Sequence, residues 1–377
     1  MIFTAKIFGI FPTTKVNEWF GIIPKDVTVM IFKKSSKIID IESYETFSAH
    51  HVKKIYIPKI SRDRHGIVNI TFLDNFIYSL FSFLYLPYII FHDKIIFITP
   101  SYMQTGIIPI LNLFRKKVYT VVLDSQLPLY MTYKEKKSPF LYIYIKISEL
   151  LEKQAIKNAD KVFVVSNYLY KKYKKYNKNI FLTPNGSDVE LINKIKPKRI
   201  TKQFTITYMG ALDFQRGVDL LINAFKKLKK KHKTKLLIIG GGKNLEGLKR
   251  IAADDKDIIF TGYMSHNEAI SYCKGSDVLT MTARDDELIR SLSSLKFFEY
   301  IACEVPILTT ETGDHAYWTK KLDVGLVVND SVDSIHKGLE RLIRNKKLYR
   351  KFKQNARKNK FQIDFKNTRK DFVNQII

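Results

Sequence analysis

The sequence predicts an α/β fold of two doubly wound, Rossmann-like domains, each a parallel sheet flanked by helices, facing a central cleft. Two observations predict it. The chain has 377 residues and is 45% hydrophobic, which is too long for one ordinary core and apolar enough for two. Short apolar runs also alternate with helical patterns along the chain, as is typical of parallel sheets. In such sheets ligands bind at the carboxyl ends of strands, beside helix N-termini.

The first half of the chain predicts an N-terminal domain over residues 1–190. Apolar runs rich in β-branched residues predict strands at Ala5–Phe11, Val27–Phe32, Lys54–Ile57, Lys94–Thr99, Val118–Leu123 and Lys161–Val165. Apolar residues at helical spacing predict helices at Asn69–Leu84, Thr105–Leu113 and Ser138–Lys157.

The second half repeats the alternation and predicts a C-terminal domain over residues 200–345. A stretch rich in Lys, Pro and Asn, residues 185–201, is interpreted as the interdomain linker. Strands are expected at Phe204–Met209, Lys235–Ile239, Ile258–Phe260, Val278–Thr282, Ile307–Thr309 and Gly325–Val328. Helices are expected at Gly217–Lys231, Leu245–Ala253, His266–Lys274, near Ser293–Ala302, at Val332–Arg344 and at Leu348–Ile377. The basic helices of residues 346–377 are expected to pack back towards the N-terminal domain.

The net charge of +28 indicates an anionic partner, because so large a charge repels itself. Residues 101–200 hold 19 Lys and Arg against 7 Asp and Glu, whereas residues 251–350 hold 13 against 16. Anionic lipid, nucleic acid and phosphorylated substrates are the candidates, and a general basic drift of composition is the plain alternative. The two cysteines are too few for a disulfide framework and indicate a reducing compartment. The scattered histidines predict no metal site.

Two segments bear on membranes. Residues 76–91 are strongly apolar but short for a membrane span, so they are either buried core or an interfacial segment. Residues 134–146 mix lysines with aromatic and aliphatic side chains, a composition that favours an anionic membrane surface. No secretory signal is evident near the start of the sequence, so a cytoplasmic protein, peripheral on the inner face of the cell membrane, is expected.

The helix near Ser293–Ala302 carries a cation, Lys296, in its first turn and Glu299 three residues later. A cation there works against the helix dipole. Either the two side chains form a plain salt bridge, or the helix end holds an anionic ligand.

Several separate blocks of sequence follow one another in a characteristic order: Ala159–Ser166, Thr183–Gly186, Tyr208–Phe225, Leu236–Gly242, Phe260–Tyr263, Tyr272–Val278 and Ser293–Thr310. In this order and spacing they resemble the retaining glycosyltransferases of the GT-B fold (glycosyltransferase family 4, "group 1"). The resemblance covers roughly residues 150–330 and is faint over residues 1–149.

The resemblance implies transfer of a hexose-type sugar from a nucleotide-sugar donor to a hydroxyl of a glycan or lipid-linked acceptor, with retention. No metal or other cofactor is implied. Arg216 and Lys296 match the cations that face the donor diphosphate, and Glu299 matches the carboxylate that accepts hydrogen bonds from the ribose. The resemblance also implies a front-face mechanism, in which the leaving phosphate takes the acceptor proton.

The remaining donor site is implied by the same resemblance. Tyr263 and Met264 lie where the family frames the base. Residues 287–294 are expected to form a loop whose N–H groups cradle the donor. The other expected donor-binding residues are Gly210, Ser291, Ser293, Ser294 and Leu295.

The sequence departs from the family pattern at several positions. Ser291 replaces the first of two family Glu residues, Ala211 replaces an Arg, residues 12–18 lack a Gly-Gly turn, and Leu123 precedes Asp124 where the family has His-Asp. Asp124, at the end of an expected strand, is the candidate catalytic residue of the N-terminal domain, or else a turn or helix-capping Asp. The departures leave open a catalytically degenerate GT-B protein, and the charge leaves open a polyanion-binding protein, although no specific nucleic-acid partner is expected.

Overall fold

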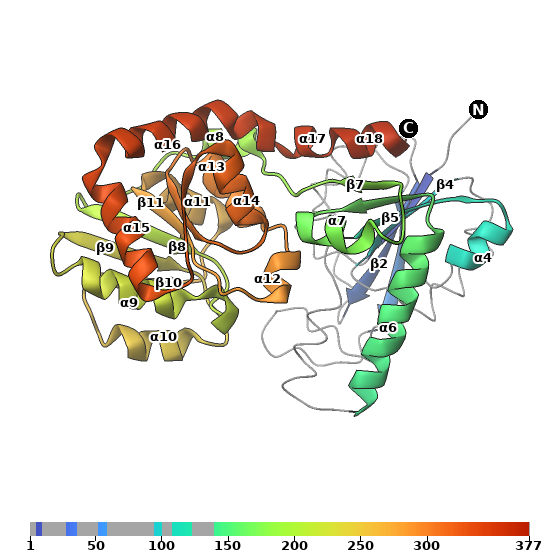
Figure 1. The fold of residues 1–377 in the computed structure, drawn as a ribbon, viewed down its shortest axis with the longest axis horizontal. Helices are drawn as coiled ribbons and strands as arrows, with labels where there is room; N and C mark the ends of the chain where they lie inside the picture. Colours follow the sequence, from blue (N-terminus) through green and yellow to red (C-terminus); the bar gives the residue numbers. More distant parts are fainter. Residues whose placement is uncertain are drawn as a thin grey trace. The chain divides into compact units, whose positions relative to one another are not determined.

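A computed structural model of the chain describes residues 5–9, 28–35, 52–58, 94–99, 108–122 and 139–376 (Figure 1). The chain divides into two compact units, the first formed by Met1–Thr183 with Arg369–Ile377 and the second by Pro184–Thr368. Each unit is built around one parallel sheet with helices. The expected α/β class with two separate parallel sheets is therefore confirmed.

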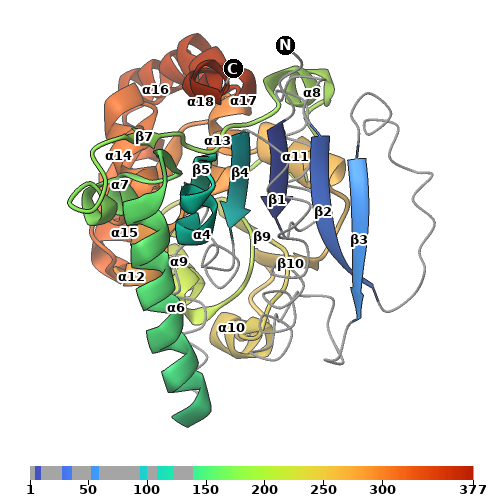
Figure 2. The same cartoon turned by 90° about the vertical axis from the view of Figure 1, so that its right-hand side faces the viewer.

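The described strands of the first unit form one sheet in the order β3-β2-β1-β4-β5-β6-β7, and Figure 2 shows the first four of them side by side. The first strand lies inside the sheet and the chain winds outwards on both sides of it, as a doubly wound fold requires. The strands are β1 Ala5–Gly9, β2 Thr28–Ser35, β3 Val52–Pro58, β4 Lys94–Thr99, β5 Lys117–Val122, β6 Lys161–Val164 and β7 Ile180–Leu182. Only β7, three residues long, was not expected.

The described helices of the first unit are α4 Ile108–Leu113, α6 Pro139–Asn158, α7 Asn167–Tyr173 and α18 Lys370–Ile376. One side of α6 is buried, including Ile145 and Ile156. The ring of Phe372 in α18 lies 4.8 Å from that of Phe163 in β6, so the end of the chain packs on this sheet. The helix expected at Asn69–Leu84 lies outside the described residues.

The second unit holds a six-stranded sheet in the order β10-β9-β8-β11-β12-β13 among the described residues. Every expected strand of this half is present: β8 Phe204–Met209, β9 Thr234–Ile239, β10 Ile258–Gly262, β11 Val278–Met281, β12 Ile307–Thr310 and β13 Gly325–Val328. Its helices are α8 Val189–Lys194, η3 Phe214–Arg216, α9 Val218–Leu228, α10 Leu245–Ala252, α11 His266–Gly275, α12 Glu287–Ser291, α13 Leu295–Ala302, α14 Gly313–Leu322, α15 Val332–Arg344, α16 Lys346–Asn359, η4 Lys360–Ile363 and α17 Phe365–Thr368.

The structure differs from expectation around α8. The stretch interpreted as a linker, residues 185–201, lies in the second unit and contains this helix. Asp188 caps α8 by accepting a hydrogen bond from the N–H of Leu191 at 2.8 Å. Val189 and Ile192 are buried in the core of the unit, so two apolar side chains outweigh the polar composition of the stretch.

The single terminal helix expected at Leu348–Ile377 is wrong, because the structure breaks it between α16 and α17. Asp364 interrupts it: its carboxylate accepts hydrogen bonds from the N–H groups of Val189 at 3.2 Å and Lys366 at 3.0 Å. Its backbone also forms a β-bridge with Ser187. Of the segment expected to pack towards the N-terminal domain, residues 369–377 belong to the first unit and residues 346–368 to the second.

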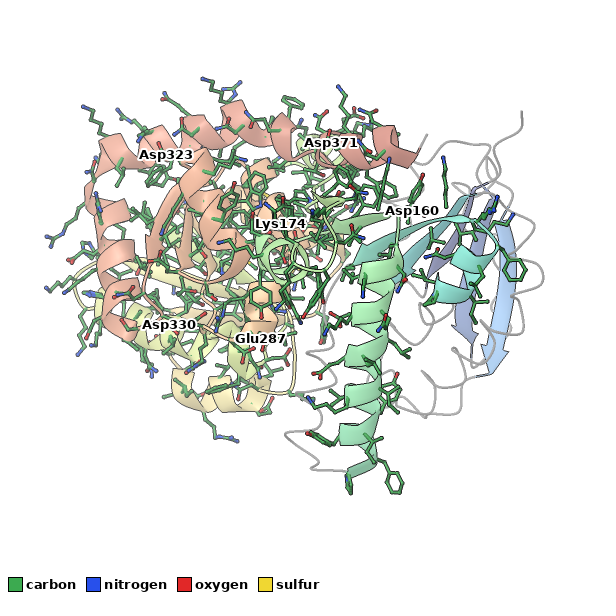
Figure 3. The ribbon with its side chains drawn as sticks, turned by 45° about the vertical axis from the view of Figure 1, so that its right-hand side comes forward. Asp160, Lys174, Glu287, Asp323, Asp330 and Asp371 are labelled. Atoms are coloured by element: carbon green, nitrogen blue, oxygen red, sulfur yellow. The ribbon has the colours of Figure 1, made fainter. Side chains whose placement is uncertain are left out.

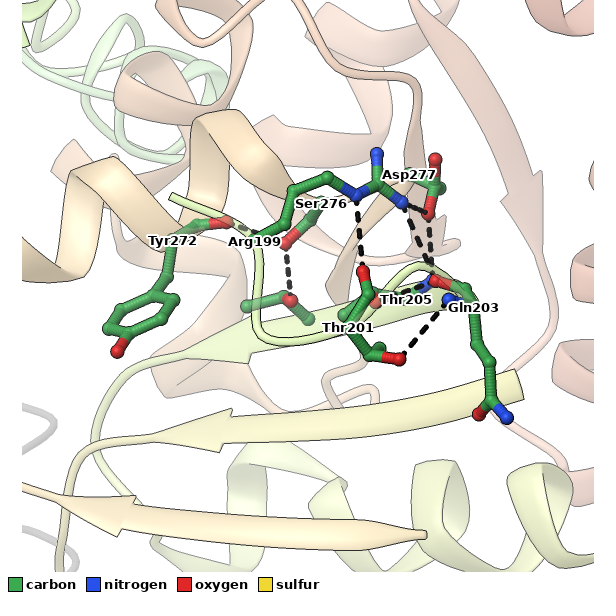
Figure 4. Close-up of polar contacts among 8 residues, drawn as sticks. Arg199, Thr201, Gln203, Thr205, Tyr272, Ser276 and Asp277 are labelled. Atoms are coloured by element: carbon green, nitrogen blue, oxygen red, sulfur yellow. Dashed lines mark hydrogen bonds and ion pairs between the residues drawn. The ribbon is translucent and has the colours of Figure 1, made fainter. Parts of the chain in front are cut away.

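A polar network fixes the amino ends of β8 and β11 (Figure 4). One carboxylate oxygen of Asp277 accepts hydrogen bonds from the N–H of Thr205 at 2.8 Å and from Arg199 at 2.6 Å. The hydroxyls of Thr207 and Ser276 lie 2.6 Å apart. The network sets the register of two central strands, and the candidate site lies at the opposite, carboxyl ends of the same strands.

Candidate functional site

Two glycine-containing turns lie against each other at the carboxyl ends of β8 and β9. The N–H of Gly210 donates to the carbonyl of Ile239 at 2.8 Å, and the N–H of Leu212 donates to the carbonyl of Gly241 at 3.0 Å. Gly240 has φ +123°, and a Cβ on it would lie 2.1 Å from the carbonyl oxygen of Gly210. The glycine triplet therefore serves the close packing of two turns, which only a residue without a side chain permits.

Lys296 reaches the first of these turns from α13. A Cβ placed on Gly210 would lie 2.9 Å from the Nζ atom of Lys296 and 3.0 Å from the hydroxyl of Tyr208. Tyr300, one turn further along α13, holds the helix there, because its hydroxyl accepts from the N–H of Met209 at 2.7 Å and donates to the carbonyl of the same residue at 3.2 Å. The structure thus brings Gly210 and Lys296, two expected donor-site residues, into contact.

Arg216 ends the short helix η3 and is followed by a glycine in the left-handed region. Gly217 has φ +62°, and a Cβ on it would lie 2.7 Å from the carbonyl oxygen of Thr282. The Arg-Gly pair is therefore held against the carboxyl end of β11, where only glycine fits. This places Arg216 close enough to Lys296 for its charge to act on the ammonium group.

The charges of Arg216 and Lys296 act on each other, and the described residues supply no carboxylate that pairs with either. Burial and, after it, the charge of Arg216 lower the pKa of Lys296 to about 8, although the charges of Glu299 and Asp213 act in the opposite direction. Neither Arg216 nor Lys296 forms an ion pair with any carboxylate in the described part of the chain. Two adjacent cations, one of them largely buried, favour an anionic ligand because it would relieve their repulsion.

Glu299 is bound by a histidine and not by Lys296. Its Oε1 atom lies 2.7 Å from Nε2 of His266, the first residue of α11, and its side chain is 17% exposed. The plain salt bridge between Lys296 and Glu299 is therefore not formed. Of the two interpretations of this helix, the structure favours a cation that is available to an anionic ligand at the helix end.

The N-terminus of α13 offers N–H groups to the same place. Its N-cap residue is Ser294, whose side chain makes no capping hydrogen bond. Ser294 and Leu295 are half-buried, beside Lys296 in the first turn. The first N–H groups of a helix have no partner within the helix and attract anions.

Ser291 and Ser293 use their side chains within the second unit. Ser291 is buried and donates its hydroxyl hydrogen bond to the carbonyl of Leu288 at 2.8 Å. The hydroxyl of Ser293 accepts from the N–H of Asn185 at 3.1 Å, and its carbonyl accepts from the amide of the same residue at 2.5 Å. Both hydroxyls are therefore engaged in hydrogen bonds with other residues of the second unit.

The expected loop at residues 287–294 is wrong in its first part, because residues 287–291 form the helix α12, which begins at Glu287 (Figure 3). Asp286 caps this helix by accepting a hydrogen bond from the N–H of Leu288 at 2.8 Å.

The residues expected to frame the base follow β10. Tyr263 is 76% exposed, and its ring lies over Gly241, where a Cβ would be 2.6 Å from a ring carbon. Met264 is partly buried and packs against the core. The Tyr263 ring is thus open to a ligand beside the glycine turns, while the Met264 side chain is shared with the core.

The sequence reasoning missed two histidines. His266 is one of them, and His315 in the first turn of α14 is the other. His315 is buried, its ring centre lies 6.4 Å from that of Phe297, and burial together with the charge of Arg216 lowers its pKa to about 3, so it is neutral. The polar stretch Thr312-Gly313-Asp314 at the start of α14 could have indicated this helix and the histidine that follows. The helix α14 itself was not predicted from the sequence.

Two further expectations concern the catalytic role of Asp124 and a metal site. Asp124 lies outside the described residues, two positions after the end of β5, and its role stays a prediction. Within the described ranges, no group of three or more His, Cys, Asp or Glu side chains is arranged to hold a metal ion.

Comparison with known proteins gives a family match over part of the chain. Residues 190–359 match the family model described as "Glycosyl transferases group 1". An uncharacterized glycosyltransferase of Methanocaldococcus jannaschii is 28% identical over 240 residues, which are 59% of this chain and 58% of that protein. The chain spans about half the length of the curated relatives it matches.

Solved structures share the whole fold. Sucrose-phosphate synthase of Thermosynechococcus elongatus superposes with a TM-score of 0.73 at 15% identity, over 99% of this chain and 98% of that chain. Anabaena HepE, solved in complex with UDP, superposes with a TM-score of 0.66 at 12% identity, over 99% of both chains. Such low identities carry the fold alone, and the expected GT-B fold is confirmed.

Proposed function

We propose that this chain is a glycosyltransferase that binds a nucleotide-sugar donor at the carboxyl ends of β8 and β11 in its second unit. One observation carries the proposal: Arg216 and Lys296 lie close enough for their charges to interact, with no carboxylate partner among the described residues, beside the uncapped start of α13. The group 1 match over residues 190–359 supports it, as does the likeness to a protein whose structure holds UDP.

The chemistry of sugar transfer fits this pair of cations. When the bond to the sugar breaks, negative charge develops on the leaving nucleoside diphosphate. Preorganised cations and N–H groups stabilise such charge most effectively where water is excluded. Arg216 offers a planar fork of donors to phosphate oxygens. Lys296 offers a largely buried ammonium, and the start of α13 adds N–H groups.

Three finer features belong to the same proposal. Glu299 accepts hydrogen bonds from the ribose hydroxyls, and the ring of Tyr263 lies against the base. The two cations take the place that a divalent metal has in other transferases, so the reaction needs no metal or other cofactor. A hexose-type sugar is transferred with retention, and the leaving phosphate takes the acceptor proton. These features are supported by the resemblance of the sequence blocks to the retaining family.

The acceptor is a glycan or lipid-linked glycan, and the enzyme works at the cytoplasmic face of an anionic membrane. This part of the proposal rests on the outer face of α6. The first residues of this helix, 139–146, are the described part of the basic and aromatic stretch at residues 134–146. Phe140, Ile143, Ile147 and Leu150 are 76%, 54%, 46% and 58% exposed. Exposed lysines run along the same helix at positions 146, 153 and 157.

An apolar stripe beside a row of lysines suits the interface of a membrane that contains anionic lipid. Among the described residues, no helix is both long and apolar enough to cross a membrane. The apolar segment at residues 76–91 lies outside the described residues.

The test is a screen of nucleotide sugars, with release of the nucleoside diphosphate as the readout. One donor is expected to be consumed, faster with a lipid-linked or glycan acceptor, and Lys296→Met is expected to abolish the release. A nucleotide that binds without any turnover would support the degenerate GT-B alternative. Binding of polyanions alone would support the polyanion alternative.

A further inference from the structure

The pair formed by His266 and Glu299 joins two helices at the candidate nucleotide site. Nε2 of His266 and Oε1 of Glu299 lie 2.7 Å apart, and the His side chain is 52% exposed while that of Glu299 is 17% exposed. Half-exposed ion pairs of this kind add little to stability. The pair therefore contributes little to the stability of the fold. Its position beside Lys296 indicates a role in recognition of the ligand.

Both partners stand on helices that the core holds rigidly. Ser265 caps α11, accepting from the N–H of Glu268 at 3.3 Å. Buried residues of α11 and α13 belong to one hydrophobic cluster: Ala269, Ile270 and Cys273 from the first helix, and Phe297, Phe298, Tyr300, Ile301 and Ala302 from the second. His266 thus starts from a fixed backbone position and defines where the carboxylate of Glu299 lies.

The geometry leaves the rest of the carboxylate available. An ionised carboxylate has two oxygens and about four acceptor positions. In the described part of the chain, the one side-chain hydrogen bond of Glu299 is that with His266, at Oε1. Oε2 is therefore left for a ligand with hydroxyl donors. His266 also comes three residues after Tyr263 in the sequence, so the pair links the segment that carries the ring expected beside the base to the helix that carries the carboxylate expected beside the ribose.

The pair also keeps Glu299 away from the cations. Lys296 lies three residues earlier on α13, a spacing at which Lys and Glu readily form an ion pair. If Glu299 turned to Lys296, it would neutralise the charge that an anionic ligand needs and would lose its orientation. The hydrogen bond to His266 holds it in the other orientation.

We propose that His266 is a positioning residue for nucleotide recognition, which holds the carboxylate of Glu299 so that its free oxygen accepts hydrogen bonds from the ribose hydroxyls. The inference rests on the proposed donor site and adds to it a residue and a role. The held carboxylate gives the enzyme a preference for ribonucleotides over nucleotides that lack these hydroxyls.

The test compares two ligands on a set of variants by isothermal titration calorimetry. The ligands are the nucleoside diphosphate that binds best and its 2′,3′-dideoxy counterpart. The wild type is expected to prefer the ribonucleotide at least about tenfold, because hydrogen bonds to a charged group are among the stronger ones. His266→Ala is expected to reduce this preference to about threefold or less, since the carboxylate is then no longer held.

Two shape-matched variants separate positioning from simple loss of a side chain. The amide of Gln extends to the place of Nε2, whereas the amide of Asn matches Nδ1. His266→Gln is therefore expected to keep most of the preference and His266→Asn to lose it. Asn267→Ala, the exposed neighbour on α11, is the matched control and is expected to bind as the wild type does.

Each outcome decides something. If His266→Ala keeps the wild-type preference, the inference is overturned while the proposed donor site stands. If the wild type binds both ligands equally, the ribose role of Glu299 and the inference both fail, and nucleotide binding remains. If no nucleoside diphosphate binds the wild type, the proposed function fails with them.

Discussion

The ammonium group of Lys296 occupies the space that any side chain at position 210 would take. A Cβ on Gly210 would lie 2.9 Å from Nζ of Lys296. This contact joins the turn after β8 to the first turn of α13, and it makes glycine at this position a requirement of the site more than of the fold.

The first prediction follows from this contact. Gly210→Ala is expected to weaken nucleoside diphosphate binding about tenfold or more, because it displaces the ammonium from its place. The flexible end of the Lys side chain moves at low cost, and the hydroxyl of Tyr208, 3.0 Å from the same Cβ, has to shift by only a few tenths of an ångström, so the melting temperature is expected to change little. Calorimetry and thermal unfolding measure the two effects. Gly217→Ala is the contrast: with φ +62° and Thr282 at 2.7 Å, it is expected to cost roughly 1–3 kcal/mol of stability. Equal nucleotide binding by Gly210→Ala and the wild type would contradict the assignment of Lys296.

The second prediction concerns pH. The pKa of Lys296 is lowered to about 8 by burial and by the charge of Arg216, so the free protein loses this charge as pH rises through that value. A bound diphosphate favours the charged ammonium, and phosphate itself stays ionised in this range. Above pH 8 the affinity is therefore expected to fall up to about tenfold per pH unit, with net proton uptake on binding. Calorimetry in buffers of different ionisation enthalpy measures the uptake, which Lys296→Met should abolish.

The lowered pKa of Lys296 also affects the stability of the free protein. Whereas nucleotide affinity falls as pH rises, this contribution to stability grows. The folded protein holds the Lys296 proton less tightly than the unfolded chain does. The contribution of this group to stability therefore increases as pH rises from about 8 towards the ordinary Lys value of 10.5. Unfolding by denaturant at pH 7.5 and 9.5 compares wild type with Lys296→Met. The variant is expected to lack the part of the pH dependence that comes from this residue.

The third prediction is metal independence. If Arg216 and Lys296 neutralise the leaving diphosphate, chelation of divalent metals should leave the rate of transfer within about twofold, far less than the losses that follow removal of one transition-state donor. The measurement is the initial rate with and without EDTA. A loss of activity that magnesium or manganese restores would show that the two cations are not sufficient.

The fourth prediction concerns the outer face of α6. Replacing Ile143 and Leu150 by Ser is expected to reduce co-sedimentation with vesicles that contain anionic lipid, because each exposes less apolar surface to the interface. Binding of the wild type is expected to weaken with salt, since each basic residue near the surface adds about 1 kcal/mol of screened attraction. Leu191→Ser, at a leucine of the second unit that is 40% exposed, is the matched control. If the wild type does not bind such vesicles at low salt, the proposed association with an anionic membrane is wrong.

The fold was predictable from the sequence wherever an element carries its own apolar period. Strands of the second unit such as β8 and β13 begin and end where expected, because continuous apolar runs are typical of strands buried on both faces. Short elements such as β7 and α8 were missed, because too few apolar residues form them. The break at Asp364 depends on a hydrogen bond from the N–H of Val189, 175 positions away, which no local pattern indicates.

The site was predictable in part. The cation at Lys296 conflicts with the helix dipole, and that conflict is visible in the sequence. The role of Gly210 and the pairing of Glu299 with His266 depend on how distant turns and helices meet, so they became visible only in the structure. The same is true of Ser293, whose hydrogen bonds go to Asn185.

The most direct test of the central claim is a thermal-shift screen with UDP, GDP, ADP, CMP and TDP on the wild type, Lys296→Met and Asn267→Ala. A ligand that binds only the folded protein raises the melting temperature, and about a hundredfold excess over the Kd adds about 2.7 kcal/mol. We expect that one nucleoside diphosphate stabilises the wild type and the Asn267→Ala control by several degrees and leaves Lys296→Met unchanged. A screen in which no nucleotide stabilises the wild type, or in which Lys296→Met responds equally, would contradict the donor site.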